Sequence, residues 1–272
     1  MYSKKPINRM ICIDNIITGF VENKDKGFYF AGESHDFWEI VFVSSGKITA
    51  SADERIYHLS SGNLLFHRPM EYHRIWCEND EAAYVNIISF SASGEGMKYF
   101  EKCCFDLNET ESRQFSEITD LFSEAINQYI MHNTEKYNHI SNLAASLLEV
   151  FLLKLTGKSE YKQKNHTESE RRYFQIVSIM KHNINKKLSV NQLAKLCNMS
   201  VSNMKRVFAL YSDIGIAKYF LNLKLREART LLREGKTISE TAEILGFDEI
   251  SYFYKVFKRE TGVTPAQYRR SV

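Results

Sequence analysis

Two groups of hydroxyl and cationic side chains recur about 48 residues apart in the last third of the chain. Side chains of these types hydrogen-bond to base edges and neutralise phosphates, so they suit the major groove of DNA. Helical spacing puts each group on one face of a helix and apolar residues on the opposite face, which must pack inward. We predict that both groups bind DNA. They are Ser202, Lys205 and Arg206 in the first copy and Ser251, Tyr254, Lys255 and Lys258 in the second.

Each group is expected on the second helix of a helix–turn–helix unit. Ser189 is followed three residues later by Gln192, and Thr237 by Glu240. This spacing is a capping box, in which two side chains satisfy amide donors at a helix start. One such unit alone would be interpreted as an amphipathic helical hairpin with a solvated basic face. The duplication, with matching caps, favours two DNA-reading units instead.

The turns between the helices also match in the two copies. Asn198 and Gly246 stand at the equivalent position, and both residue types tolerate the left-handed backbone of a sharp turn. Ser200 and Asp248 come two residues later and are the expected N-caps of the second helices. The predicted DNA-reading helices cover residues 200–211 and 249–260.

Positive charge is concentrated in the same part of the chain. Residues 170–272 contain 19 Lys and Arg against 9 Asp and Glu, a net of +10, whereas residues 1–169 contain 17 against 24, a net of −7. The two values sum to the overall +3. A basic segment favours phosphate neutralisation with salt-dependent affinity. The acidic first part argues against membrane or general polyanion binding by that part.

One long helix, over residues 217–234, is predicted to join the two units. Its 18 residues would make a rod of about 27 Å. Two reading helices on one side of a DNA duplex need a separation of about 34 Å, one helical turn. Lys224, Arg226 and Arg229 on this helix are the predicted phosphate contacts.

The first part of the chain has a different pattern. Short apolar runs alternate with turn residues, which is typical of a small β-barrel or sandwich. Two helices are predicted after them, near residues 109–132 and 137–156, and the second carries a broad apolar stripe. A polar segment near residues 157–167 is the expected linker. The predicted strands cover residues 37–44, 47–52, 55–59, 63–67 and 83–90.

Two stretches resemble known families. Gly246 to Arg269 is similar to the carboxy-terminal signature of the AraC/XylS family of bacterial transcription regulators. Gly32 to Glu39, with the later Pro69 and His73, resembles a cupin barrel, the sensor domain of part of that family. The resemblance implies an α+β chain with a cupin-like β-barrel, two following helices, and an all-α DNA-binding domain of two helix–turn–helix units joined by a long helix. The implied boundaries are 1–105 for the barrel, 106–156 for a helical dimerisation region, 157–168 for the linker and 169–272 for the DNA-binding domain.

The cupin resemblance also implies an effector pocket. We expect His35, Trp38, Glu39 and His73 to bind the ligand. His35, Glu39 and His73 fall at positions where many cupins hold a metal, but that motif needs two histidines separated by one residue, and Phe37 stands where the second would be. A non-metal pocket is therefore the favoured interpretation, with no metal, no cofactor and no catalytic residue. His67 is expected to be a structural or surface histidine.

These features predict a ligand-responsive activator of transcription that is not an enzyme. The expected partners are double-stranded promoter DNA, a small-molecule effector such as a sugar, RNA polymerase and a second copy of the chain, with no membrane. The absence of a signal peptide or an 18-residue apolar run predicts a cytoplasmic protein. Two alternatives remain, a constitutive DNA-binding protein with a structural barrel and a metal-dependent cupin enzyme fused to a DNA reader.

Overall fold

The computed structural model describes residues 5–53, 55–78, 80–101, 104–159 and 166–271. The chain divides into two compact units, Met1–Asn165 and His166–Val272. The boundary falls within the predicted linker, of which residues 160–165 lie outside the described residues. No helix in the described ranges is long and apolar enough to cross a membrane.

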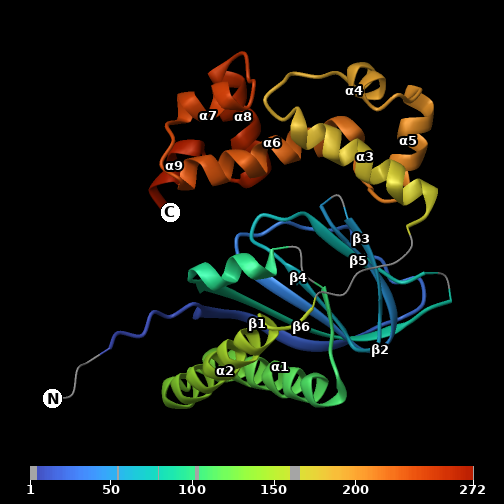
Figure 1. The fold of residues 1–272 in the computed structure, drawn as a ribbon. Helices are drawn as coiled ribbons and strands as arrows, with labels where there is room; N and C mark the ends of the chain where they lie inside the picture. The colour runs from blue at the N-terminus through green and yellow to red at the C-terminus, as the bar shows by residue number, and fades with distance from the viewer. Residues whose placement is uncertain (1–4, 54, 79, 102–103, 160–165, 272) are drawn as a thin grey trace. The chain divides into compact units, whose positions relative to one another are not determined.

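The first unit is built on antiparallel strands. β1, β6, β2, β4 and β7 lie side by side in that order, and β3 and β5 pair with the second half of β2 (Figure 1). A short 3-10 helix, Glu95–Phe100, precedes the last strand. The strands are β1 Cys12–Lys24, β2 Trp38–Ala52, β3 Arg55–Ser60, β4 Asn63–His67, β5 His73–Trp76, β6 Ala83–Ser93 and β7 Cys104–Asp106.

β2 is a single bent strand, although the sequence predicted two. The bend lies at a register shift between Val43 and Ser45 and at Gly46, whose φ is +77°. A Cβ atom at Gly46 would lie 1.9 Å from the Ala82 carbonyl oxygen, so only glycine fits there. The first half of β2 pairs with β4 and β6, and the second half with β3 and β5. The bend therefore folds one sheet over the other.

The two faces of β2 belong to two different cores. Trp38, Ile40 and Phe42 pack into a cluster with the following helices, whereas Val41 and Val43 face the interior between the sheets. This is the alternation of a strand buried on both faces. The helices are α1, Glu109–Ile130, and α2, Thr134–Leu155, which lie side by side against the sheet next to β1 and β6 (Figure 1).

The second unit consists of helices. Its two helix–turn–helix pairs are α4 with α5 and α7 with α8, and the long helix α6 runs between them (Figure 1). The capping boxes predicted at Ser189 and Thr237 are confirmed. Each of these side chains accepts a hydrogen bond from the backbone N–H three residues on, and its own backbone N–H donates to the side chain of that residue, Gln192 or Glu240. The helices are α3 Glu168–His182, α4 Val190–Leu196, α5 Val201–Ala209, α6 Ile216–Arg233, α7 Ile238–Ile244, α8 Ile250–Thr261 and α9 Pro265–Ser271.

The turns follow the prediction with one exception. Asn198 and Gly246 have left-handed φ values of 54° and 64°, and Ser200 caps α5 as expected. Asp248 does not cap α8, so that prediction is wrong. The N-cap of α8 is Glu249, without a side-chain cap bond, and the Asp248 carboxylate instead forms an ion pair with Lys187 at 2.5 Å.

Candidate functional site

The outer face of α5 carries the first predicted DNA-binding group. Met204, Val207 and Phe208 are buried on the inner face of this helix. Ser202, Lys205 and Arg206 are exposed. The Arg206 guanidinium donates a hydrogen bond to the Asn203 side chain at 3.0 Å, which holds it along the helix surface. The expected separation of an apolar inner face from a polar outer face is therefore present.

The outer face of α8 repeats this arrangement. Phe253, Val256 and Phe257 are fully buried. Ser251, Lys255 and Lys258 are exposed, and Tyr254 is half-buried. Both helices lie in the same compact unit. The second unit thus presents two separate helix faces with hydroxyl and cationic side chains, the types of group that bind base edges and phosphates.

Lys224 does not fit its predicted role as a phosphate contact. Its side chain is buried, and the ammonium group donates hydrogen bonds to backbone carbonyls of Ile184 and Lys186 at 2.7 and 2.9 Å. A buried ammonium group with internal acceptors cannot neutralise a phosphate on bound DNA. Helical periodicity could not reveal this burial, because lysine is the residue type that a solvated basic face would also carry.

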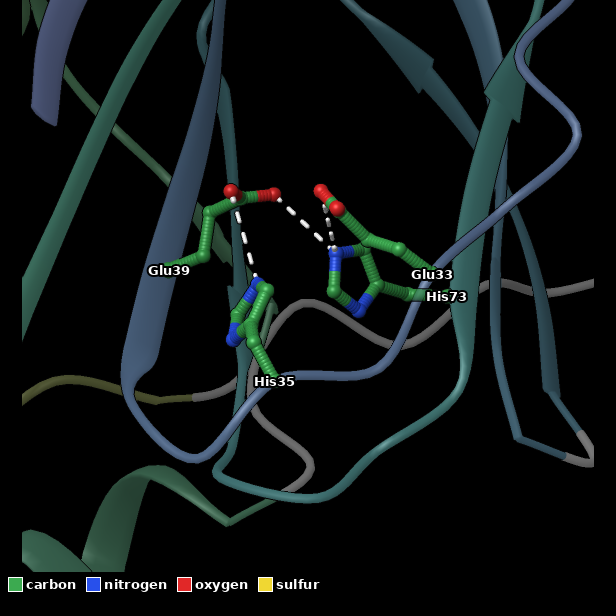
Figure 2. Close-up of side chains that lie close together, drawn as sticks. All are labelled: Glu33, His35, Glu39 and His73. Carbon is green, nitrogen blue, oxygen red and sulfur yellow. Dashed lines mark ion pairs between the residues drawn. The ribbon is translucent and has the colours of Figure 1, made fainter. Parts of the chain in front are cut away.

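A second group of polar residues lies in the first unit. Figure 2 shows Glu33, His35, Glu39 and His73 converging on one point. Each offers one ligand atom, and these atoms all lie within 4.8 Å of one another. The structure thus brings three of the predicted ligand-binding residues together, namely His35, Glu39 and His73, and it adds Glu33.

The imidazole rings of this group are oriented by the backbone. His35 Nδ1 lies 3.0 Å from the Phe37 carbonyl oxygen, and His73 Nδ1 lies 3.1 Å from that of Glu71. Because a carbonyl oxygen can only accept a hydrogen bond, Nδ1 carries the proton in both rings. The two Nε2 atoms point at the carboxylates, and both are buried without a hydrogen bond within the described residues.

The carboxylate of Glu39 lies between the two histidines. Its oxygens are 3.7 Å from His35 Nε2 and 3.3 Å from His73 Nε2, and Ser89 donates a hydrogen bond to it at 3.2 Å. Burial disfavours the charged carboxylate, but the two imidazole groups outweigh it and hold the pKa of Glu39 well below its usual range. Burial likewise opposes the charged form of His73, yet Glu39 raises the pKa of His73.

This geometry fits a divalent metal ion. Tetrahedral ligands about 2.0–2.2 Å from a zinc ion lie roughly 3.3–3.6 Å from one another. The separations of His73 from Glu39 and Glu33 are 3.3 and 4.0 Å, and that of His35 from Glu39 is 3.7 Å. Backbone hydrogen bonds that fix Nδ1 and leave Nε2 for the ion are the usual outer support of a metal-binding histidine.

The structure places a different pair of residues at the spacing that the metal motif requires. The sequence motif placed the second histidine of the pair at Phe37, whose ring instead stacks on His35 at 3.7 Å between centroids. The two residues of the group that are separated by one residue are Glu33 and His35. Glu33 was not predicted from the sequence, because the motif calls for histidine at that position, although its spacing from His35 was a usable signal.

Trp38, also predicted to bind the ligand, does not lie in this group. It is adjacent to Glu39 on β2, and successive side chains of a strand point to opposite faces. Its indole is buried with Ile40 and Phe42 in the core beneath α1 and α2. The alternation of side chains along a strand predicts this separation of Trp38 from Glu39.

His67 is a structural histidine that lies next to the group. Its ring is fully buried and stacks on that of His73 at 4.2 Å between centroids. Nδ1 lies 3.3 Å from a Glu71 carboxylate oxygen. Burial and the nearby His73 lower the pKa of His67. Apolar residues of the inner core, such as Val41 and Val85, fill the neighbouring space between the sheets.

Comparison with known protein families gives two matches in different parts of the chain. Residues 20–150 match the family of AraC-like ligand binding domains. Residues 193–271 match a family of helix-turn-helix domains. The first match contains the Glu33–His73 group, and the second contains both exposed helix faces.

Similar whole proteins are regulators of transcription. The chain is 22% identical over 236 residues to the HTH-type transcriptional activator RhaR of Mannheimia succiniciproducens, covering 86% of this chain and 85% of that protein. It is 24% identical over 271 residues to the Msm operon regulatory protein of Streptococcus mutans, covering 92% and 90%.

The similar solved structures include one that matches most of this chain and one DNA complex. Fatty acid-bound ToxT from Vibrio cholerae is 14% identical, with coverage of 94% of this chain and 96% of that one and a TM-score of 0.37. The DNA-binding domain of AdpA in complex with a target DNA is 22% identical, covering 36% and 88%, with a TM-score of 0.34.

Proposed function

The chain belongs to the AraC/XylS family of regulators, and on this basis we propose that it is a ligand-responsive, sequence-specific DNA-binding protein that activates transcription. The observation that carries the proposal is the pair of exposed polar faces on α5 and α8 within one compact unit. Each face enters a major groove. α6, with 18 residues and a length of about 27 Å, lies between the two helix–turn–helix pairs.

The effector site is the group formed by Glu33, His35, Glu39 and His73. A metal ion suits it better than the sugar that we expected from sequence. The four ligand atoms lie within 4.8 Å of one another, which matches one ion, and the neighbouring interior is filled by apolar side chains. Two imidazole nitrogens and two carboxylates are ligands for zinc or a similar divalent ion. A bound ion would tie Glu33 and His35, which precede β2, to His73 on β5.

The regulatory mechanism requires a difference in affinity. An effector changes DNA binding only if it binds two arrangements of the protein unequally. The relatives carry regulator names, and we propose no catalytic role for the Glu33–His73 group. As an activator, the chain would act on RNA polymerase at the promoter.

The outer face of α2 supports a homodimer. Leu143, Leu147 and Val150 follow one another at helical spacings of four and three residues and are 40–49% exposed. The opposite face of the helix, including Leu148 and Leu152, is already buried in its own unit. An apolar stripe with this spacing packs against a second helix of the same kind. We assign it to a second copy of the chain related by a two-fold axis.

Selection of DNA sites from a random pool by the purified full chain tests the proposal. Enrichment of one sequence with two preferred segments about one turn apart supports it. Recovery of unenriched DNA from a folded protein, with and without added divalent metal, contradicts it. A site bound equally tightly in both conditions would favour the constitutive alternative.

A further inference from the structure

Lys224 is a buried cation at the centre of the second unit. It lies in the middle of α6 and is 6% exposed. Its ammonium group donates to three backbone carbonyls, those of Ile184, Lys186 and Leu245. An ammonium group has three donors, so all of them are used. A buried charge is tolerated when it is fully hydrogen-bonded in this way.

The three acceptors adjoin two different helix–turn–helix pairs. Ile184 and Lys186 lie in the connection between α3 and α4, which leads directly to the N-cap of α4 at Ser189. Leu245 is the C-cap of α7 and precedes the turn into α8. Lys224 lies on α6, between the two pairs. It therefore links the segment that leads into α4 to the turn between α7 and α8.

Close backbone packing supports the same junction. A Cβ atom at Gly246 would lie 2.2 Å from the carbonyl oxygen of Asn185, so the turn and the connection are in direct contact. Ile184 packs against the core of the second pair. Lys187 and Asp248 form an ion pair across the same junction at 2.5 Å. These contacts require the α3–α4 connection to keep its position, which the hydrogen bonds from Lys224 fix.

Aromatic rings enclose the ammonium group. The centroids of Phe220 and Phe247 lie 5.1 and 5.5 Å from Nζ. Rings at this distance attract a cation through their faces. The carbonyl groups and the rings together specify a cation with three donors at this position. A neutral apolar side chain of the same length would fill the space but leave the carbonyls without this donor.

We propose that Lys224 is the positioning residue that fixes the two DNA-reading helices relative to each other, and thereby sets the spacing between the DNA segments that they bind. The proposal rests on the proposed function for its DNA consequence only. α6 alone joins the pairs through one covalent path. Lys224 adds a non-covalent connection and supports the other contacts at the junction, and these connections together restrict rotation of one pair against the other.

A distance measurement without DNA tests the positioning role directly. Spin labels are attached through a ketone-bearing unnatural amino acid at Ala209 on α5 and Arg259 on α8, which leaves the native cysteines in place. Double electron–electron resonance on the full chain, diluted with excess unlabelled chain so that a dimer carries only one labelled copy, should give one narrow distance distribution. In Lys224→Met the distribution should be at least twice as broad, and Lys224→Arg, which keeps charged donors, should restore most of the narrowness. Lys236→Met, at an exposed lysine after α6, is the matched control and should change nothing.

An unchanged distribution in a folded Lys224→Met chain would overturn the proposal. If circular dichroism shows that this variant does not fold, Lys224→Gln, which retains two amide donors, is measured in the same way, with broadening expected and an unchanged width as the contradicting result. This readout needs no DNA, so it decides the role of Lys224 even if the proposed function fails.

Binding to altered DNA sites tests the consequence for specificity. The probe is the site selected by the full chain, together with versions that carry one base pair more or less between the two bound segments. One base pair changes the separation by about 3.4 Å. The wild-type chain should lose at least tenfold in affinity for both versions, and Lys224→Met less than threefold. Equal losses for the two proteins would show that Lys224 does not set the spacing.

Discussion

Glu39 Oε1 lies 3.3 Å from His73 Nε2, although Glu39 is the second residue of β2 and His73 is the first of β5. His73 is paired in register with Ala52, at the far end of the strand that Glu39 enters. Because β2 is bent, its second half and the paired strand β5 lie close to the start of β2. The bend at Gly46 therefore brings His73 next to Glu39 and forms the polar group.

Metal binding is the first prediction from this arrangement. The purified chain should bind one equivalent of Zn²⁺ in isothermal titration, and His73→Ala should abolish that binding because it removes the most buried ligand. Glu33→Gln should weaken it by roughly tenfold, since Glu33 is half-exposed and contributes least. His139→Ala, at an exposed histidine on α2, is the control. Equal binding by wild type and His73→Ala would exclude the site.

Base reading by the two exposed helix faces is the second prediction. Arg206→Ala or Lys255→Ala should weaken binding to the selected site by about 1–3 kcal/mol and relax the preference at one base position. Competition binding against single-base variants of the site measures both effects. Lys154→Ala, an exposed lysine of the first unit, should have no effect. Weakening that is uniform across all variants would make the residue a phosphate contact.

Much of the second unit could be predicted from sequence because its signals are local. Capping boxes at Ser189 and Thr237, turn residues at Asn198 and Gly246, and helical periodicity depend on neighbours only a few residues away. Lys224 and Asp248 are the failures. Their partners, Ile184 and Lys187, lie 40 and 61 residues distant in the chain, and no local pattern indicates such contacts.

The first unit was harder to predict for the same reason. The bounds of β4 and the start of β3 were correct, because turn residues flank them closely. β1, β5 and β7 were missed, since they are short or weakly patterned and are stabilised by pairing with distant strands. The two strands predicted at residues 37–44 and 47–52 form the single strand β2, because Gly46 bends the strand where a turn was expected. Glu33 joins the polar group through its backbone pairing with His73, which is distant in the sequence.

Self-association through α2 is the third prediction. Leu147→Glu should convert a dimer to a monomer in light scattering, because a charge in an apolar seam lacks a partner. Asn138→Glu, at an exposed position of the same helix away from the stripe, should leave the dimer intact. The far-ultraviolet circular dichroism of both variants should match that of the wild type. A dimer that persists in folded Leu147→Glu would rule out this face.

Modularity is the fourth prediction. The second unit has its own apolar core and its own capped helices, so a fragment that begins at Thr167 should fold and bind the selected site without any added effector. Fluorescence anisotropy with labelled DNA measures the affinity. A soluble, helical fragment that fails to bind would show that the first unit is needed for recognition itself.

Hydroxyl-radical footprinting of the full chain on its selected site shows whether each helix face binds its own DNA segment. We expect two protected segments about 10 base pairs apart on one side of the duplex. One should be lost in a chain carrying alanine at Ser202, Lys205 and Arg206, and the other on alanine at Ser251, Lys255 and Lys258. A single protected segment, or two segments that survive both sets of substitutions in folded proteins, would contradict binding by the two faces.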